Sequence, residues 1–421
     1  MPIQSLLMLF GCDTWSIGRK KAGRQKLMGE YSYLFYNNAS ELEFSYWAEA
    51  SHSTPLFLRM PYLSLLEQIK SDNISMRYVV ILKGETPVMW VYFQIIDFTV
   101  DVFGSMIAEQ FELLKKSKGK LFESYFKSKK DAVLMRLVTS GNNFVSGEYG
   151  FHAVEGMDRK EVFRLLGAIN EEIGRREKLR GKISATLVKD FYAAQLPDST
   201  DPVGEKYFSF SVEPNMIVDL PEANDVLSYI SFFSKKYRNR AKSIFKASEN
   251  IEVRELTAEE ILQFKAEIFA LYMQVFNHAK FKLVCLREDY FHEMKLRFPE
   301  EFKLFAFFYK GKMLSFCSCL IPGEGNTLYG HYLGFDYENN KEYELYQNML
   351  YKFIDVALKE KKSQVNLGRT ASEIKSTVGA KAHDLTCYIK PQNTVSKLIL
   401  KPFISYLQPT QWIPRNPFKE E

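Results

Sequence analysis

Two stretches of the chain repeat one pattern of apolar and polar positions. Residues 76–96 and 302–321 each contain two runs rich in β-branched and aromatic residues, separated by a short turn with a central Lys-Gly pair. Two such runs around a glycine turn are typical of a β-hairpin. Each hairpin is followed by another apolar run, at 132–142 and at 327–335, so a third strand is predicted in each place.

An amphipathic helix is predicted after each third strand. Apolar side chains recur there at three- and four-residue intervals, which is the helical period: Val162, Leu165, Leu166, Ile169 and Ile173 in the first stretch, and Tyr346, Met349, Leu350, Phe353, Ala357 and Leu358 in the second. A closing strand is predicted at 182–191 and at 364–370. The order β-β-β-α-β therefore occurs twice, which predicts an α/β (α+β) protein made of two related halves.

The repeat predicts the organisation of the whole chain. We assign its parts as an N-terminal extension at 1–54, a first half at 55–221 with a charged helical insertion near 99–131, a basic linking helix at 222–250, a second half at 251–390, and an aromatic and basic C-terminal arm at 391–421. The second half is the part in which we expect the active site.

The linking helix is strongly basic on one side. Its predicted buried face consists of Val226, Ile230, Phe233, Tyr237, Ala241 and Ile244, and no acid interrupts its cations, Lys235, Lys236, Arg238, Arg240, Lys242 and Lys246. These cations are either a solvated face that complements the carboxyl end of the helix or a patch that attracts phosphates. Both interpretations stay open.

Composition narrows the class of protein. A chain of 421 residues with 46% hydrophobic residues suits two domains of ordinary size, and a net charge of +5 is a mild basic bias rather than a nucleic-acid-binding composition. Five scattered cysteines and six histidines form no metal-ligand spacing, so reduced thiols and no metal site are expected. The apolar run "SLLMLF" is too short to cross a bilayer, and we expect a cytoplasmic protein.

At this level of detail the chain resembles a known family. The two-fold β-β-β-α-β plan is similar to the tandem fold of FemAB-like proteins and of the BioF2-like branch of the GNAT superfamily. The stretches that carry the resemblance are "FFSKKYRNRAK", "LYGHYLGFDYENNKEYELYQNMLYKFIDVALKEKK", "NLGRTASEIKSTVGA" and, in the first half, "TSGNNFVSGEYGF". The resemblance runs from about Pro55 to Lys390 and implies a tandem GNAT-like acyl-CoA N-acyltransferase fold.

The resemblance implies transfer of an acyl or aminoacyl group from a thioester or ester to an amine. No permanently bound cofactor is expected; acyl-CoA or an acyl carrier protein would be a co-substrate, and charged tRNA is the alternative donor. The GNAT pyrophosphate loop is absent, because its nearest match, "RLLGAI" at 164–169, lies inside a predicted helix on the core-facing side. We therefore interpret that stretch as structural.

Three residues are predicted to be catalytic. His331 lies in a predicted strand near two glycines, Gly330 and Gly334, which favour a bulge or a close approach, although a lone strand histidine equally suits a core. Lys375 is predicted to stabilise an oxyanion or a phosphate, and Glu373 to act as a base or orienting group. Their structural alternatives are a solvated lysine and, for Glu373, a salt bridge with Arg369 four residues earlier.

The predicted substrate- and donor-binding residues lie at the ends of strands and on the linking helix. They are Asn366, Gly368, Arg369 and Gly379 after the closing strand of the second half, Asn142 and Glu148 in the first half, Tyr346 on the second amphipathic helix, and Arg238 on the linking helix. Strand ends are the usual ligand sites of open α/β sheets. For Asn142 and Glu148 the alternative is a glycine-rich turn, and for Tyr346 it is a place in the helix core.

Three functional hypotheses follow. The first is an N-acyltransferase that uses acyl-CoA and acylates a small-molecule or lipid amine, with a peripheral membrane contact at the inner face of the membrane. The second is a FemX-type aminoacyltransferase that uses charged tRNA on a peptidoglycan precursor. The third is a non-catalytic binding protein that retains the fold. No G-x-S-x-G elbow is present, which disfavours a hydrolase.

Overall fold

The computed structural model describes residues 23–419 apart from 43–44, 51–53, 100–132, 179–183, 198–201, 280–283, 394–395, 398–399, 401–403 and 405–406. Almost all of the insertion predicted near 99–131 lies outside the described residues, as do Cys12 and the run "SLLMLF".

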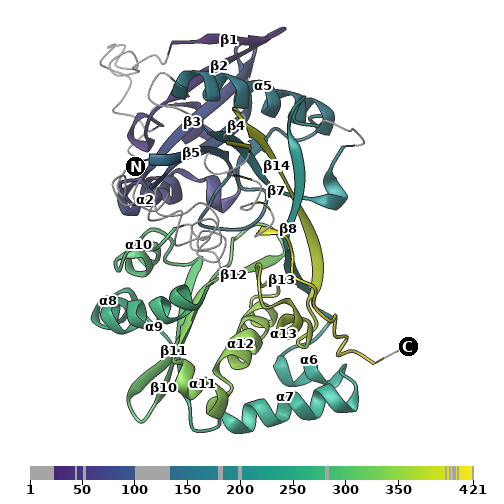
Figure 1. Ribbon diagram of the computed structural model, residues 1–421. Helices are drawn as coiled ribbons and strands as arrows, with labels where there is room; N and C mark the ends of the chain where they lie inside the picture. The colour runs from purple at the N-terminus through teal and green to yellow at the C-terminus, as the bar shows by residue number, and fades with distance from the viewer. Residues whose placement is uncertain are drawn as a thin grey trace, which may run out of the picture.

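The described strands form one 14-stranded mixed sheet that extends through both halves of the molecule (Figure 1). The first half contributes the predicted order as β3 (Ile74–Lys83), β4 (Thr86–Thr99), β5 (Val133–Ser140), α5 (Arg159–Lys178) and β7 (Ala185–Tyr192). The second half repeats it as β10 (Phe302–Tyr309), β11 (Lys312–Leu320), β12 (Thr327–Phe335), α12 (Leu345–Lys359) and β13 (Gln364–Asn366). In both halves the helix connects two parallel strands, β5 to β7 and β12 to β13, so the repeat extends to the topology.

Two long strands join the half-sheets. β8 (Phe208–Asp219) pairs with β13, and β14 (Lys381–Pro391), which comes from the end of the second half, lies between β7 and β8. Figure 1 shows β8 and β14 running side by side from the upper half into the lower one. Because β14 of the second half is inserted between β7 and β8, the strand ends of both halves meet at the centre of the sheet.

Further strands extend the edges of the sheet. Part of the predicted N-terminal extension forms β1 (Gln25–Met28) and β2 (Tyr31–Tyr36), and β2 pairs with β3 of the first half. β9 (Glu252–Glu255) forms the opposite edge, and β6 (Phe151–Ala153) pairs with β4. Residues 25–36 are thus an integral part of the first half-sheet.

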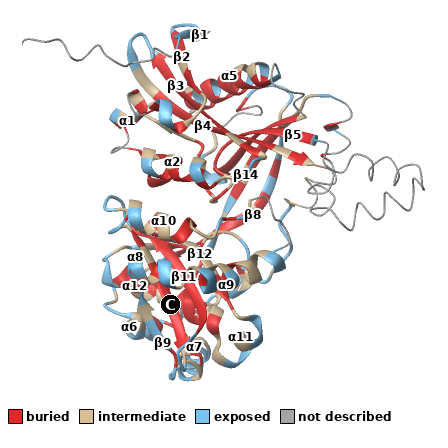
Figure 2. Ribbon diagram, turned by 90° about the vertical axis from the view of Figure 1, so that its left-hand side faces the viewer, coloured by how far each residue is buried: buried red, intermediate tan, exposed pale blue. Residues whose placement is uncertain are grey.

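The remaining helices cover the faces of the sheet. They are α1 (Tyr46–Ala50), α2 (Met60–Ile69), α8 (Ala258–Gln263), α9 (Lys265–His278), α10 (Tyr290–Arg297), α11 (Tyr337–Tyr343) and α13 (Ser372–Ser376), with 3-10 turns at Ala39–Leu42, Leu56–Leu58 and Ala193–Gln195. Figure 2 shows the strands mostly buried and the outer helix faces exposed. The predicted apolar face of α5 is buried throughout, as is that of α12 except for the half-buried Tyr346.

The linking segment contains two helices rather than the single helix expected. α6 (Val226–Ser231) ends at Phe232, and α7 (Lys235–Ala247) begins after Ser234. The break occurs where Phe233 forms an isolated bridge with Phe418 of the C-terminal arm and the Ser234 N–H donates to the Pro417 carbonyl. The arm therefore interrupts the helix by pairing with its backbone.

Candidate active site

A polar loop follows β13 and enters the α13 helix. Asn366 accepts a hydrogen bond from the Gly368 N–H at 2.9 Å through its side-chain oxygen, which holds the first turn of this loop. Gly368, Thr370 and Ala371 all have left-handed backbone conformations, with φ of 70°, 68° and 50°. A β-branched residue such as Thr370 adopts this conformation only at an energetic cost, and such costs concentrate at functional sites.

Lys375 lies on α13 and turns its side chain back into this loop. Its Nζ donates to the carbonyl oxygens of Arg369 at 2.6 Å and Gly368 at 3.2 Å, and the residue is only 4% exposed. Burial lowers the pKa of Lys375 to about 7, although the negative charge of Glu213 acts in the opposite direction. An ammonium has three N–H donors, so one remains for a substrate.

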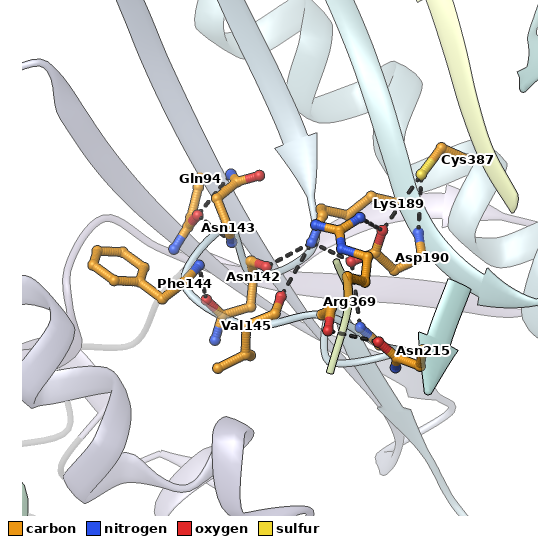
Figure 3. Close-up of polar contacts among 12 residues, drawn as sticks. Gln94, Asn142, Asn143, Phe144, Val145, Lys189, Asp190, Asn215, Arg369 and Cys387 are labelled. Atoms are coloured by element: carbon orange, nitrogen blue, oxygen red, sulfur yellow. Dashed lines mark hydrogen bonds and ion pairs between the residues drawn. The ribbon is translucent and has the colours of Figure 1, made fainter. Parts of the chain in front are cut away.

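The Arg369 side chain connects the second half to a buried charge cluster of the first half (Figure 3). Its Nη1 lies 3.2 Å from Oδ1 of Asp190, and the other carboxylate oxygen of Asp190 binds Lys189. Lys189 also donates to the Asn142 carbonyl at 2.7 Å and to the Val145 carbonyl at 3.2 Å. Lys189 and Asp190 thereby fix the loop after β5 beside the loop after β13.

Asp190 is ionised despite its burial. Burial alone would raise the pKa of Asp190, but the charges of Arg369 and Lys189 outweigh it, and the pKa lies below its usual value. Asp190 has a φ of 65° and also accepts a hydrogen bond from the Gly147 N–H at 3.3 Å. A buried aspartate in this strained conformation serves to hold two cations in place rather than to exchange protons.

His331 lies at a bulge of β12. Cys317 pairs with Leu333 and Cys319 with Gly330, so His331 and Tyr332 both face Ser318. This bears out the bulge expected from the flanking glycines, and the packing of α9 explains Gly334, since a Cβ there would lie 2.5 Å from the Tyr272 backbone nitrogen.

The imidazole of His331 is neutral, and one of its two ring nitrogens has a hydrogen-bond partner among the described residues. Its Nε2 lies 2.9 Å from the Tyr290 hydroxyl, whereas its Nδ1 is buried and has no hydrogen-bond partner in the described part of the chain. Burial lowers the pKa of His331 to about 3. A free imidazole with this pKa is a weak base, so His331 is better suited to a hydrogen bond with a substrate than to proton abstraction.

These elements surround one large cavity between the two halves. Its volume is about 1470 Å³, and it lies along the part of β12 beyond Tyr329, where the pairing with β13 has ended. Most of its wall is aromatic or aliphatic, with side chains from both halves and from the C-terminal arm, among them Phe57, Phe144, Tyr149, Phe210, Val275, Phe276, Tyr329 and Trp412. An apolar cavity with a few convergent polar groups is the usual form of a small-molecule site.

Seven of the predicted site residues lie in this cavity wall: His331, Tyr346, Asn366, Gly368, Arg369, Glu373 and Lys375. Tyr346 is half-buried on α12. Glu373 pairs with Arg415 of the C-terminal arm at 2.6 Å, and Arg369 pairs with Asp190. The alternative of a salt bridge between Arg369 and Glu373 is therefore wrong, because each has a partner elsewhere in the sequence.

Four predicted residues lie outside the cavity wall: Gly379, Glu148, Asn142 and Arg238. Gly379 has a φ of 100°, and a Cβ there would lie 2.5 Å from the Tyr229 hydroxyl oxygen. Glu148 is bound by Arg159 at 2.6 and 2.7 Å and by the Tyr192 N–H. Asn142 is fully buried and shapes the loop after β5 through its hydrogen bond from the Phe144 N–H. Arg238 is half-buried on α7, and its guanidinium donates to the Ser231 carbonyl at 3.4 Å, whereas the other cations of α7 are exposed.

Sequence reasoning missed three charged residues of the wall: Lys189, Asp190 and Glu213. Lys189 and Asp190 lie inside β7, between apolar residues, but a Lys-Asp pair in a sequence is more typical of a solvated surface than of a buried site. Glu213 precedes Pro214 within β8, and a proline inside a long strand was the available signal of a bulge.

None of the described helices is long and apolar enough to cross a membrane. In the same part of the chain, no group of three or more His, Cys, Asp or Glu side chains is arranged to hold a metal ion.

Solved structures identify the fold. The crystal structure of FemX matches 87% of this chain and 99% of its own, with a TM-score of 0.52 and 11% sequence identity. This chain has the FemX fold. A tandem GNAT protein from the clavulanic acid biosynthesis pathway matches at 8% identity and a TM-score of 0.44, over 86% of this chain and 99% of that one.

A third match is more partial. L-PGS from Bacillus licheniformis matches at 10% identity and a TM-score of 0.43, over 66% of this chain and 83% of its own. No protein-family model matches the sequence, and no curated protein matches it either. The likeness to FemX, together with the repeated β-β-β-α-β order, confirms the tandem FemAB-like fold predicted from the sequence.

Proposed function

We propose that the protein is an N-acyltransferase that moves an acyl group from a thioester donor, acyl-CoA in the first place, to an amine. The observation that carries this proposal is the buried Lys375, whose side chain is fixed by two carbonyl oxygens in the wall of an apolar cavity. Acyl transfer develops negative charge on the carbonyl oxygen, and a preorganised cation in a water-poor site is the strongest way to stabilise it.

The shape of the cavity supports a donor with an extended arm. Beyond Tyr329, no described strand pairs with the β13-facing side of β12, although β12 continues to Phe335. An unpaired strand edge binds extended chains through their amide groups, and the arm that carries the thiol in CoA and in acyl carrier protein contains such amides. The aromatic wall then accommodates the acyl chain, which favours a long chain over an acetyl group.

The reaction needs no covalent enzyme intermediate. The amine nitrogen attacks the thioester carbonyl, the oxyanion is stabilised by the ammonium form of Lys375, and the thiolate leaves as the amide forms. His331 Nδ1 provides one further hydrogen-bonding group in the same wall. The cations of α7 lie outside the cavity, where they would attract the phosphates of the donor or of a membrane.

A second candidate is aminoacyl transfer from charged tRNA. The FemX fold favours it. A second argument comes from the helix after β12: the Asp336 carboxylate caps the amino end of α11, and its negative charge disfavours the binding of a CoA pyrophosphate there. A non-catalytic binding protein is the remaining alternative. In that case substitution of Lys375 would leave every biological activity intact.

Calorimetric titration with acyl-CoAs of increasing chain length, with free CoA as the baseline, tests the proposal. We expect binding that tightens with chain length, because each added methylene buries apolar surface in the cavity. Binding at no chain length would reject acyl-CoA as the donor and favour an acyl carrier protein or charged tRNA.

A further inference from the structure

Glu213 lies at a second bulge, in the strand that crosses between the two halves. His383 of β14 pairs with Asn215 of β8, but Leu385 pairs with Val212, so β8 contains one extra residue at Glu213 and Pro214. Proline has no backbone N–H and so cannot donate a hydrogen bond to a neighbouring strand, which suits Pro214 to a bulge where regular pairing is interrupted. A bulge re-aims side chains, and here the Glu213 side chain lines the cavity.

Within the described part of the chain, the Glu213 carboxylate has hydrogen-bond partners that are neutral. Its Oε1 accepts hydrogen bonds from the Thr410 hydroxyl at 3.2 Å and from the Thr410 N–H at 3.3 Å, both from the C-terminal arm. Among the described residues of the cavity wall, the other carboxylates are those of Asp190 and Glu373, and both form ion pairs. Glu213 is the carboxylate of this wall that no described cation neutralises.

Glu213 also acts on Lys375 across the cavity. Its charge raises the pKa of that lysine against the larger effect of burial, although the two side chains form no ion pair. The described part of the cavity wall thus contains a carboxylate on β8 without a cationic partner and the Lys375 amine on α13. An acceptor ammonium binds at a negative group, and an acyl carbonyl oxygen that becomes an oxyanion binds at a positive one.

We infer that Glu213 binds the ammonium group of the acceptor amine and takes one proton from it before the transfer. This inference rests on the proposed function and assigns the class of acceptor: a primary amine that is cationic in water, on an apolar body. The Glu213 carboxylate first takes one proton from the bound ammonium and passes it to solvent, which leaves a neutral amine with a free electron pair. This nitrogen then forms its bond to the acyl carbon and releases its second proton to solvent. The carbon–sulfur bond breaks, and the thiolate leaves with the bonding electron pair. Thr410 holds the carboxylate in position.

Calorimetry with octylamine and 1-octanol as probes tests the assignment. The variant is Glu213→Gln, which keeps the shape and the acceptor oxygen, and the matched control is Asp219→Asn, an exposed carboxylate of the same strand. We expect Glu213→Gln to weaken octylamine binding at least about tenfold, because the variant loses a hydrogen bond between two charged groups. Binding of 1-octanol should be unchanged. Asp219→Asn should bind both probes like the wild type.

Two results would overturn the assignment. The first is equal octylamine affinity in the wild type and in Glu213→Gln, and the second is an equal loss of affinity for octylamine and for 1-octanol. A parallel measurement of acyl transfer separates this failure from failure of the proposed function. Transfer by the wild type that persists in Glu213→Gln rejects only the role of Glu213. Amine binding that depends on Glu213 without any transfer rejects the enzyme and retains a cation-binding site.

Discussion

The Arg369 guanidinium lies 3.2 Å from the Asp190 carboxylate and so connects the loop after β13 to the end of β7. Asp190 is fully buried, whereas Arg369 is 29% exposed in its side chain and faces the cavity. The same carboxylate binds Lys189 of the first half. The ion pair between Arg369 and Asp190 therefore holds the strand end of the second half against that of the first.

Asp190→Asn should destabilise the protein by about 3–5 kcal/mol, because it leaves the buried Lys189 ammonium without its counter-charge. Urea unfolding monitored by circular dichroism measures the change, with Asp219→Asn as an exposed control expected within about 0.5 kcal/mol of the wild type. A loss below about 1 kcal/mol for Asp190→Asn would mean that the cluster does not hold the halves together.

Gly379→Ala should release the C-terminal arm. A Cβ at this position would lie 2.5 Å from the Tyr229 hydroxyl oxygen and 3.0 Å from the Phe418 ring, in a backbone with a φ of 100°. Gly325→Ala is the matched control, since its φ is 83° but its surroundings are open. We expect backbone strain of about 1 kcal/mol in the control and at least about 2 kcal/mol more at Gly379, from thermal unfolding. Equal losses would refute the packing role of Gly379.

Lys375 should make stability depend on pH. Its pKa is lowered to about 7 in the folded protein from 10.5, so between these values the unfolded chain binds more protons and stability rises with pH. Lys375→Met lacks this dependence. The stability of the wild type relative to Lys375→Met should therefore increase by roughly 3–4 kcal/mol from pH 7 to pH 10 in urea unfolding. A constant difference over this range would show that the amine is not desolvated.

His331 should remain neutral at every pH at which the protein is folded and active. With its pKa near 3, its ring resonances should not shift between pH 5 and pH 8 in the nuclear magnetic resonance spectrum. The resonances of this ring are assigned by their loss from the spectrum of the His331→Gln variant. A titration midpoint between about 6 and 7, the range of an ordinary histidine, would contradict the buried, uncharged state and restore His331 as a candidate base.

Local patterns predicted the repeated part of the fold well. The two hairpins, the third strands and both amphipathic helices appear where apolar periodicity indicated them, and β12 occupies the predicted 327–335. The position of β14 between β7 and β8 was not predictable, because strand order depends on contacts between residues far apart in the sequence. The same holds for the break between α6 and α7, which the C-terminal arm causes.

The candidate site was predictable only on one side. The segment from Asn366 to Gly379 combines three charged residues with two glycines, and this local signal located the residues that line the cavity. The partners that define their roles come from elsewhere: Asp190 for Arg369, and Arg415 for Glu373. Pairings of this kind depend on the fold of both halves, so no spacing along the chain reveals them.

The central claim is that Lys375 promotes acyl transfer in the cavity, and detection of the amide product tests it most directly. Purified protein is incubated with palmitoyl-CoA and a set of alkylamines, and amides are quantified by mass spectrometry. We predict amide formation by the wild type and by Lys381→Gln, an exposed lysine control, and at least about 100-fold less by Lys375→Met. Equal amide formation by Lys375→Met and the wild type, or none by the wild type, would contradict the claim.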